Sequence, residues 1–311
     1  MKPAVVMLLS DKRSGSTMFQ QELCKHPGIN HVSYSPHTYF ETHHWLKAAV
    51  MSGTPKQEYY GHKPHMGYGS KMGARKYMID CIQGNVPGFR VPDNDNDLIF
   101  SGWEALCKQL AKPVFFEKTP HYIAHWACLN LILSWMKTTD FQVKIVGLVR
   151  NPMGVLYSAY QLFHTDPYER QFAWAGSYRN LMAFKNMLAP ENFHLVRYED
   201  IIVDPIETFR IVCEFIGVDY DPNIGKDVRS DSLNKWQNDS NFGFQIDKNV
   251  ACLAKFFGYT NGELENAGKI GVSESLSWKI RKFYRLKSAM ILDRILKPLL
   301  LKTFQRNDKK S

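Results

Sequence analysis

The sequence lacks several patterns that would place it in common classes of protein. Hydrophobic residues make up 44% of the chain, yet no uninterrupted apolar run reaches the length of about 18 residues that a membrane span needs. The six cysteines are scattered and show no paired spacing typical of zinc or redox sites. We therefore expect buried, reduced thiols and no metal site. Internal repeats and low-complexity tracts are also missing, which excludes solenoid and fibrous architectures.

A basic surplus is missing from most of the chain, although the formal net charge is +9. Residues 279–311 hold 11 Lys or Arg and 2 Asp or Glu, whereas residues 1–278 hold 28 of each sign. A basic net charge would ordinarily suggest a nucleic-acid partner. Because the part of the chain that carries the motifs described below is neutral, we expect no nucleic-acid partner.

Apolar strand-like segments alternate with amphipathic segments, which predicts an α/β fold with a parallel sheet and short crossovers. The expected strands are 5–9, 114–117, 143–149 and 193–198. The expected helices are 17–25, 122–136, 152–163, 168–188 and 205–216. Residues 51–97 are rich in Gly, Pro, Tyr, His and Asn, so we expect an irregular lid or acceptor region within about 34–100. We expect one domain over 1–265 and a helical extension over 266–311.

Residues 4–17 form an apolar run that leads into a small, basic, hydroxyl-rich loop ahead of a helix-forming segment. Gly15 lets the backbone turn tightly, and the N–H groups at the start of the helix are expected to point at one anion. The residues expected to bind this anion are Arg13, Ser14, Gly15, Ser16, Thr17 and Met18. The loop lacks the spacing and the Gly-Lys-Ser/Thr ending of a Walker A sequence, which disfavours a kinase or an ATPase.

A second apolar strand, 143–149, also ends on a basic residue, Arg150. It is followed by Pro152, which suits the first turn of a helix because its missing N–H costs nothing there. Ser158 lies about two helical turns after the strand, so Arg150 and Ser158 are expected to face a second anionic group.

These two motifs resemble those of sulfotransferases that use 3′-phosphoadenosine 5′-phosphosulfate (PAPS). In that family, a loop with Lys or Arg before Ser-Gly binds the 5′-phosphosulfate. A strand followed by Arg-Asp/Asn-Pro and a later Ser binds the 3′-phosphate. Residues 196–218 are similar to the strand-turn-helix of the family, and 232–259 to its carboxy-terminal segment, which implies that Lys235 and Trp236 bind the donor. The resemblance covers about residues 3–260 and implies a P-loop-like three-layer sandwich with helices on both faces of the sheet.

The resemblance implies an enzyme that moves a sulfuryl group from PAPS to a hydroxyl or amine of a small-molecule or sugar acceptor, without a metal. Arg13 is then the expected cation on the leaving phosphate, since its guanidinium stays charged and binds two oxygens. Lys118 follows the strand 114–117 and should leave the sheet at the same edge as Arg13 and Arg150. It occupies a Glu-Lys-Thr-Pro element similar to that of carbohydrate sulfotransferases, whose Lys lies near the transferring group.

Three residues are alternatives for the catalytic base. Heparan-type sulfotransferases use a Glu at a similar place, which points to Glu41, whereas cytosolic sulfotransferases use a His, which points to His43 or His44. Glu41 would need apolar neighbours that raise its pKa in order to act near neutral pH. No metal is expected at His43 and His44, because adjacent side chains diverge and no companion ligands stand at a suitable spacing.

Residues 276–304 interleave apolar residues at helical spacing with many Lys and Arg. This pattern favours either peripheral contact with a membrane surface or docking on the enzyme's own core or on a second subunit. With no anchor recognised in the sequence, a cytoplasmic location is expected. Two other functions stay open, namely a non-catalytic basic protein that binds anionic lipid or nucleic acid and a nucleotide-dependent kinase on a related fold. The sequence specifies neither the acceptor nor the oligomeric state.

Overall fold

The computed structural model describes residues 2–37, 39–53, 70–229, 233–240 and 242–266, together with Leu276, Ile280, Phe283 and Tyr284. The helical extension predicted for 266–311 therefore lies almost entirely outside the described residues. In the described part of the chain, no helix has both the length and the apolar character needed to cross a membrane.

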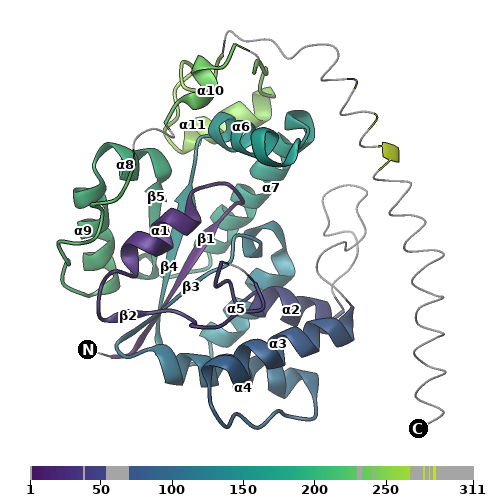
Figure 1. The fold of residues 1–311 in the computed structure, drawn as a ribbon, viewed down its shortest axis with the longest axis vertical. Helices are drawn as coiled ribbons and strands as arrows, with labels where there is room; N and C mark the ends of the chain where they lie inside the picture. Colours follow the sequence, from purple (N-terminus) through teal and green to yellow (C-terminus); the bar gives the residue numbers. More distant parts are fainter. Residues whose placement is uncertain are drawn as a thin grey trace.

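Five parallel strands form one sheet in the order β2-β3-β1-β4-β5 (Figure 1). The strands are β1 (Ala4–Ser10), β2 (Ile29–Asn30), β3 (Val114–Lys118), β4 (Gln142–Val149) and β5 (Phe193–Arg197). Four of them match the expected strands, while β2 is too short to leave a pattern in the sequence. Leu8 of β1 pairs with both Lys118 and Val146, so these three strands end at the same edge of the sheet.

Both faces of the sheet are covered, as the continuous apolar character of β1 requires. Alternate residues of β1 enter two separate cores, with Val5, Met7 and Leu9 in one and Ala4, Val6 and Leu8 in the other. The second core is covered by α1 (Ser16–Leu23), α8 (Tyr198–Val203) and α9 (Pro205–Ile216). The first core lies on the opposite face of the sheet and is covered by α2 (His44–Met51), α4 (Asp95–Leu110), α5 (Trp126–Met136) and α7 (Pro167–Lys185) (Figure 1). The predicted three-layer α/β fold is confirmed.

The expectation of an irregular region over about 34–100 is wrong for much of its length. The structure has α2 (His44–Met51), α3 (Lys71–Asn85) and the start of α4 (Asp95–Leu110) there. Helix α3 begins at Ser70, whose side chain accepts a hydrogen bond from the N–H of Gly73, and it buries Ala74, Met78 and Ile82. These residues recur every fourth position, but the lysines, glycines and polar residues between them hide the periodicity in the sequence.

The other helices agree more closely with the prediction. Helix α6 (Pro152–Phe163) and α9 have the predicted bounds, and α1 and α7 (Pro167–Lys185) lie within three residues of theirs. The expected helix over 122–136 is broken into a 3-10 turn, η2 (Tyr122–Ala124), and α5 (Trp126–Met136), because His125 between them is extended. The short elements that complete the described chain are η3 (Pro190–Asn192), α10 (Lys235–Asn238) and α11 (Lys248–Phe256).

Candidate active site

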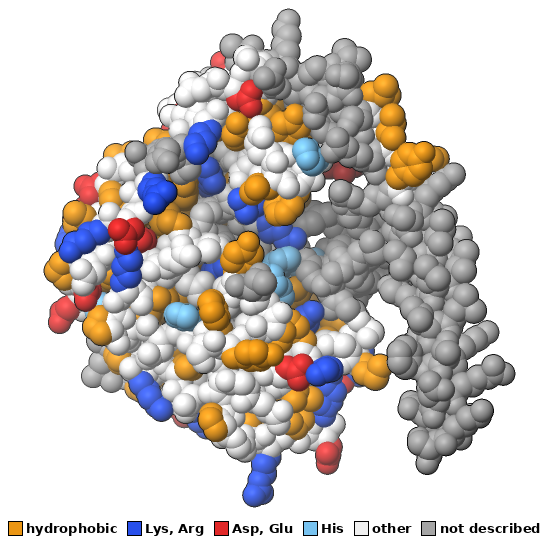
Figure 2. All heavy atoms as spheres, in the orientation of Figure 1, with side chains coloured by type: hydrophobic (Ala, Val, Ile, Leu, Met, Phe, Trp, Pro, Cys, Tyr) orange, Lys and Arg blue, Asp and Glu red, His pale blue; other side chains and the backbone are white. Residues whose placement is uncertain are grey.

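A cleft of about 750 Å³ lies at the carboxyl edge of the sheet. Lys, Arg and His side chains gather around the hollow (Figure 2). Of the expected site residues, those that line the cleft are Arg13, Gly15, Ser16, Thr17, Glu41, Arg150, Ser158, Lys235 and Trp236. The expected residues outside the lining are Ser14, Met18, His43, His44 and Lys118. The structure thus brings together motifs that lie far apart in the sequence.

The loop after β1 turns through two left-handed residues, Arg13 with φ 69° and Gly15 with φ 91°. A Cβ on Gly15 would lie 2.3 Å from Cδ2 of Tyr198, so only glycine fits at this position. Gly15 is the N-cap of α1, and Ser16 and Thr17 form the start of that helix. The N–H groups in the first turn of a helix have no intrahelical acceptor, and they carry the positive end of the helix dipole. This end of α1 is therefore suited to an anion in the cleft.

Ser14, one of the expected anion ligands, serves the fold instead. Ser14 is fully buried, its hydroxyl lies 3.0 Å from that of Tyr178, and its N–H donates to the carbonyl of Asp11. The side chain of Met18 packs against the core beneath α1. The expectation that Ser14 binds the anion is wrong, whereas Arg13 and Gly15 on either side of it line the cleft. The expectation for Met18 concerns its backbone N–H at the start of α1 and stays a prediction.

Arg13 and Arg150 stand side by side in the cleft. Nη1 of Arg150 donates to the carbonyl of Arg13 at 3.1 Å, and Nε of Arg13 donates to Oγ of Ser158 at 3.1 Å. The guanidinium of Arg150 also lies 4.3 Å from the ring centroid of Tyr198. Burial and the positive charge of Arg150 both lower the pKa of Arg13. Two like charges held this close favour a ligand with negative charge between or beside them.

Lys118 and Glu41 form a buried ion pair next to the anion loop. The Lys118 side chain is fully buried, and its Nζ lies 2.8 Å from Oε1 of Glu41 and 3.4 Å from Oγ1 of Thr17. The other carboxylate oxygen of Glu41 lies 2.9 Å from Nε2 of His43. Burial would raise the pKa of Glu41, but the hydrogen bonds and positive charges of His43 and Lys118 outweigh it and lower the pKa. The raised pKa that Glu41 was expected to need as a base near neutral pH is therefore not found.

Strand β3 fixes the segment that carries Glu41. Phe40 and His43 on either side have left-handed backbones, with φ values of 53° and 49°. Such residues cost about 1–3 kcal/mol each, so their surroundings must hold them. The buried Glu117 provides one anchor, because its Oε1 accepts hydrogen bonds from the hydroxyls of Thr42, Thr119 and Tyr122. Burial raises the pKa of Glu117 to about 7.

His44 points away from the cleft. Its Nε2 lies 2.8 Å from the carbonyl of Ile99, and its ring packs against Trp45 and Trp103 in the core. Burial lowers the pKa of His44 to about 4, so its ring stays neutral at physiological pH. The structure therefore places this candidate base in a structural role, while His43 touches Glu41 directly.

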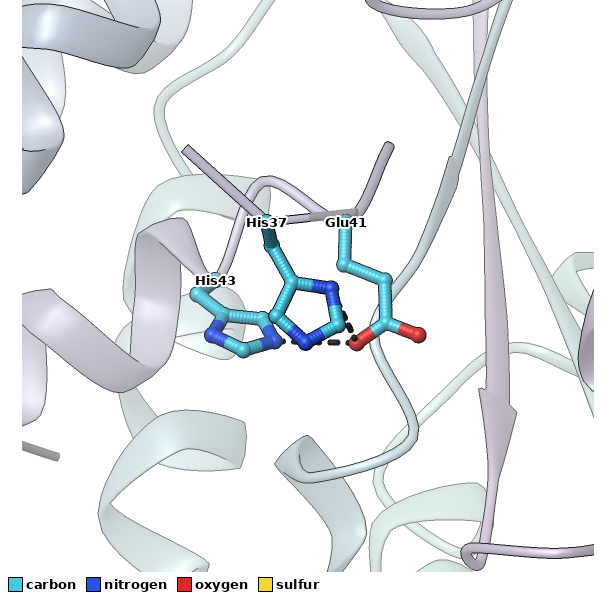
Figure 3. Close-up of side chains that lie close together, drawn as sticks. All are labelled: His37, Glu41 and His43. Atoms are coloured by element: carbon cyan, nitrogen blue, oxygen red, sulfur yellow. Dashed lines mark hydrogen bonds and ion pairs between the residues drawn. The ribbon is translucent and has the colours of Figure 1, made fainter. Parts of the chain in front are cut away.

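Several residues of the site were not expected from the sequence, and two of them matter for the argument below. His37 lines the cleft, and its Nδ1 lies 3.7 Å from the Glu41 oxygen that also faces His43 (Figure 3). The expectation that His43 has no companion ligands nearby is therefore wrong. Tyr198 also lines the cleft. The position of Tyr198 directly after β5 was the only sign in the sequence that it could reach the cleft, because its contacts with Gly15 and Arg150 form only in the folded chain.

Fold and site together define a class of protein. Proteins of this class have a P-loop-like fold of three layers, with helices on both faces of a parallel sheet. The cleft at the carboxyl ends of the strands contains the start of a helix and two arginines, which suit a ligand with two anionic groups.

The model of the sulfotransferase family matches residues 4–222, so the chain belongs to this family and is an enzyme of sulfuryl transfer. No curated protein sequence matches the chain. Among solved structures, the sulfotransferase domain of the Synechococcus PCC 7002 olefin synthase is 21% identical, covering 83% of this chain and 95% of that domain with a TM-score of 0.59. The sulfotransferase domain of the curacin biosynthetic pathway is 17% identical, covering 83% and 98% with a TM-score of 0.54. These likenesses show the fold.

Proposed function

We propose that the chain takes its sulfuryl group from PAPS and transfers it to a hydroxyl or amine of a small-molecule or sugar acceptor. One observation carries the proposal: Arg13 and Arg150, which come from two separate motifs, line the same cleft and are joined by a 3.1 Å hydrogen bond. A cleft of about 750 Å³ also has the size of a cofactor site.

The residues present fit a nucleotide that carries two anionic groups on one ribose, at the 5′ and 3′ positions. The start of α1, with Gly15, Ser16 and Thr17, is suited to the 5′-phosphosulfate. Arg150 and Ser158 are suited to the 3′-phosphate, because guanidinium and hydroxyl groups both donate to phosphate oxygens. Lys235 and Trp236 of α10 line the same cleft and complete the donor site.

When bound, PAPS supplies the sulfuryl group, and its nucleotide part departs as adenosine 3′,5′-bisphosphate. Arg13 stabilises the negative charge that develops on the leaving phosphate oxygen. We assign the catalytic base to Glu41 because, of the three candidates, it alone lines the cleft among the described residues; its lowered pKa keeps the carboxylate ionised, so that it can accept the proton of the acceptor hydroxyl or amine. His43 and Lys118 hold the Glu41 carboxylate from its two oxygens and so position it.

A binding experiment tests the donor. Adenosine 3′,5′-bisphosphate should raise the melting temperature, corresponding to about 2.7 kcal/mol at 100 times Kd, whereas ATP should not. Arg150→Ala should abolish most of this shift, and Arg210→Ala, an exposed arginine paired with Glu207 on α9, should keep it. Stabilisation by ATP alone would favour a kinase, and stabilisation by neither nucleotide would favour a non-catalytic protein.

The acceptor is tested by the product. Metabolite pools incubated with the chain and PAPS are compared by mass spectrometry, and the expected result is a compound whose mass has grown by one sulfo group. The matched control is Arg13→Ala, which lacks the proposed leaving-group cation. Products of equal amount from both proteins would contradict the assignment of Arg13.

A further inference from the structure

His37, Glu41 and His43 bring three metal-ligating groups to one point beside the cleft. The nearest ligand atoms of the three side chains all lie within 4.8 Å of one another. Both imidazoles face the same carboxylate oxygen of Glu41, at 2.9 Å from His43 and 3.7 Å from His37, while the other oxygen points away from them (Figure 3). That other oxygen is bound by Lys118, so Glu41 presents one oxygen to the pair of imidazoles.

We propose that His37, Glu41 and His43 bind a zinc-type divalent metal ion, and that the bound ion inhibits sulfuryl transfer. Two imidazoles with one carboxylate make a ligand set that Zn²⁺ accepts, with the fourth position open to water. Mg²⁺ and Ca²⁺ fit less well, since they prefer sites made of oxygen ligands alone.

The surroundings of the three residues support a preformed and accessible site. Glu41 and His43 are nearly buried, whereas 33% of the His37 side chain is exposed and Glu41 itself lines the cleft. An ion can therefore enter from the cleft. Lys118 orients the carboxylate, and the ring of Tyr77 stacks on His43 with the two planes 10° apart. Such outer contacts fix the orientation of metal ligands.

Binding exchanges one set of bonds for another. The hydrogen bond between Nε2 of His43 and Oε2 of Glu41 is lost, and the proton of the neutral imidazole is then carried on Nδ1, so that Nε2 and Oε2 both bind the metal ion through their lone pairs. Glu41 can no longer accept the proton of the acceptor while it is a ligand. This inhibitory consequence rests on the proposed function of Glu41, whereas metal binding itself does not.

Calorimetry of the full chain with ZnCl₂ in chelator-free buffer tests the site. One ion should bind per chain, and His37→Ala should weaken binding on the order of 100-fold, since even indirect partners of metal ligands contribute 10–100-fold. His26→Asn is the matched control and should bind as the wild type does, because the ring of His26 contacts the carbonyl of Asp219 and lies outside the cleft lining. Circular dichroism and a cooperative thermal transition show that each variant is folded.

Two results overturn the metal site: no binding of Zn²⁺ to the wild type, or equal binding to His37→Ala.

The inhibitory role is tested by transfer rates with Zn²⁺, each relative to the metal-free rate of the same protein. Zn²⁺ should inhibit the wild type reversibly with EDTA and should not inhibit His37→Ala at the same concentration. Binding without inhibition, or transfer that requires Zn²⁺, overturns the inhibitory role. Failure of PAPS-dependent transfer in every condition would instead contradict the proposed function, and calorimetry would still decide the site.

Discussion

At the scale of the residue, Tyr198 joins the two halves of the donor site. The guanidinium of Arg150 lies over its ring, and Gly15 of the anion loop is so close to the ring that a Cβ would meet Cδ2 at 2.3 Å. We expect Gly15→Ala to push the ring, displace Arg150 and abolish stabilisation by adenosine 3′,5′-bisphosphate. The added methyl group and the φ of 91° should also cost about 1–3 kcal/mol of unfolding free energy, measured by denaturant titration.

Gly53→Ala is the control for this prediction. Gly53 also has a left-handed backbone, with φ 81°, but a Cβ there would meet no atom within 4 Å. It should therefore cost only the backbone strain and leave nucleotide binding unchanged. Loss of binding in both variants would show that the contact with Tyr198 is not the cause.

Arg13 is expected to act mainly in the transition state. Arg13→Ala should lower kcat by about 10²–10³, which is the effect of removing a donor that stabilises developing charge. Arg13→Lys should recover part of the rate, because it keeps the charge but loses the fork that bonds Ser158. The measurement is single-turnover kinetics with saturating PAPS. A rise in KM with unchanged kcat would contradict this role and make Arg13 a ground-state ligand.

The sequence revealed those site residues whose role is set by their neighbours in the chain. Arg13, Arg150 and Ser158 belong to local strand-loop-helix patterns, so their placement could be predicted. The role of Ser14 could not, because its hydroxyl partner Tyr178 lies 164 residues away and a buried serine looks like an anion ligand in the sequence. His37 was hidden for the same reason, since its meeting with His43 depends on the path of an irregular segment.

At the scale of the element, strand β3 holds the segment that carries Glu41 in place, and the buried Glu117 of this strand is the anchor. The ordinary pKa of this carboxyl is 4.5, and burial raises it to about 7 in the folded state, with a smaller contribution from the charge of Glu41. The folded state therefore holds the proton more tightly. Its stabilising contribution is complete below about pH 4.5 and is lost as the pH rises through 7. The loss is on the order of 3 kcal/mol.

Glu117→Gln removes this titration and should flatten the fall in unfolding free energy between about pH 5 and pH 8. Denaturant titrations across that range measure the slope. The slope is the test rather than the absolute stability, because Oε2 of Glu117 has no hydrogen-bond partner among the described residues and an amide group there carries its own cost. An equal slope in wild type and variant would show that Glu117 does not titrate in this window.

Elements could be predicted where local signals mark their ends. Helices α6 and α9 begin at Pro152 and Pro205, each after a side chain that caps the helix, and both had the predicted bounds. Helix α3 has the Ser70 cap, but its buried face has only small or separated apolar residues, and its place is decided by packing. The contact between α3 and α4 is an example of such packing: Gly102 of α4 has no Cβ, and the side chain of Ile82 of α3 occupies the space where one would be.

At the scale of the whole molecule, the basic surplus and the cleft belong to different parts of the sequence. The stretch 279–311 accounts for the entire net charge of +9, while the cleft lies in the neutral part of the chain. The described side chains of Leu276, Ile280, Phe283 and Tyr284 are 48–69% exposed, and their spacing places them on one helical face. Because apolar residues at helical spacing alternate with Lys and Arg in this stretch, we propose that 276–304 contacts anionic lipid.

Deleting residues 267–311 should therefore separate two properties. Binding to vesicles that contain phosphatidylserine should be lost, because about half of the 11 basic residues near such a surface contribute roughly 5 kcal/mol at about 1 kcal/mol each. Stabilisation by adenosine 3′,5′-bisphosphate should stay, because the described residues that line the cleft all precede the deletion. Vesicle sedimentation with phosphatidylcholine alone, and with added salt, controls for charge. Lipid binding that survives the deletion would show that 276–304 is not the lipid-binding segment. Nucleotide binding that is lost with the deletion would show that the basic stretch is needed for the folded donor site.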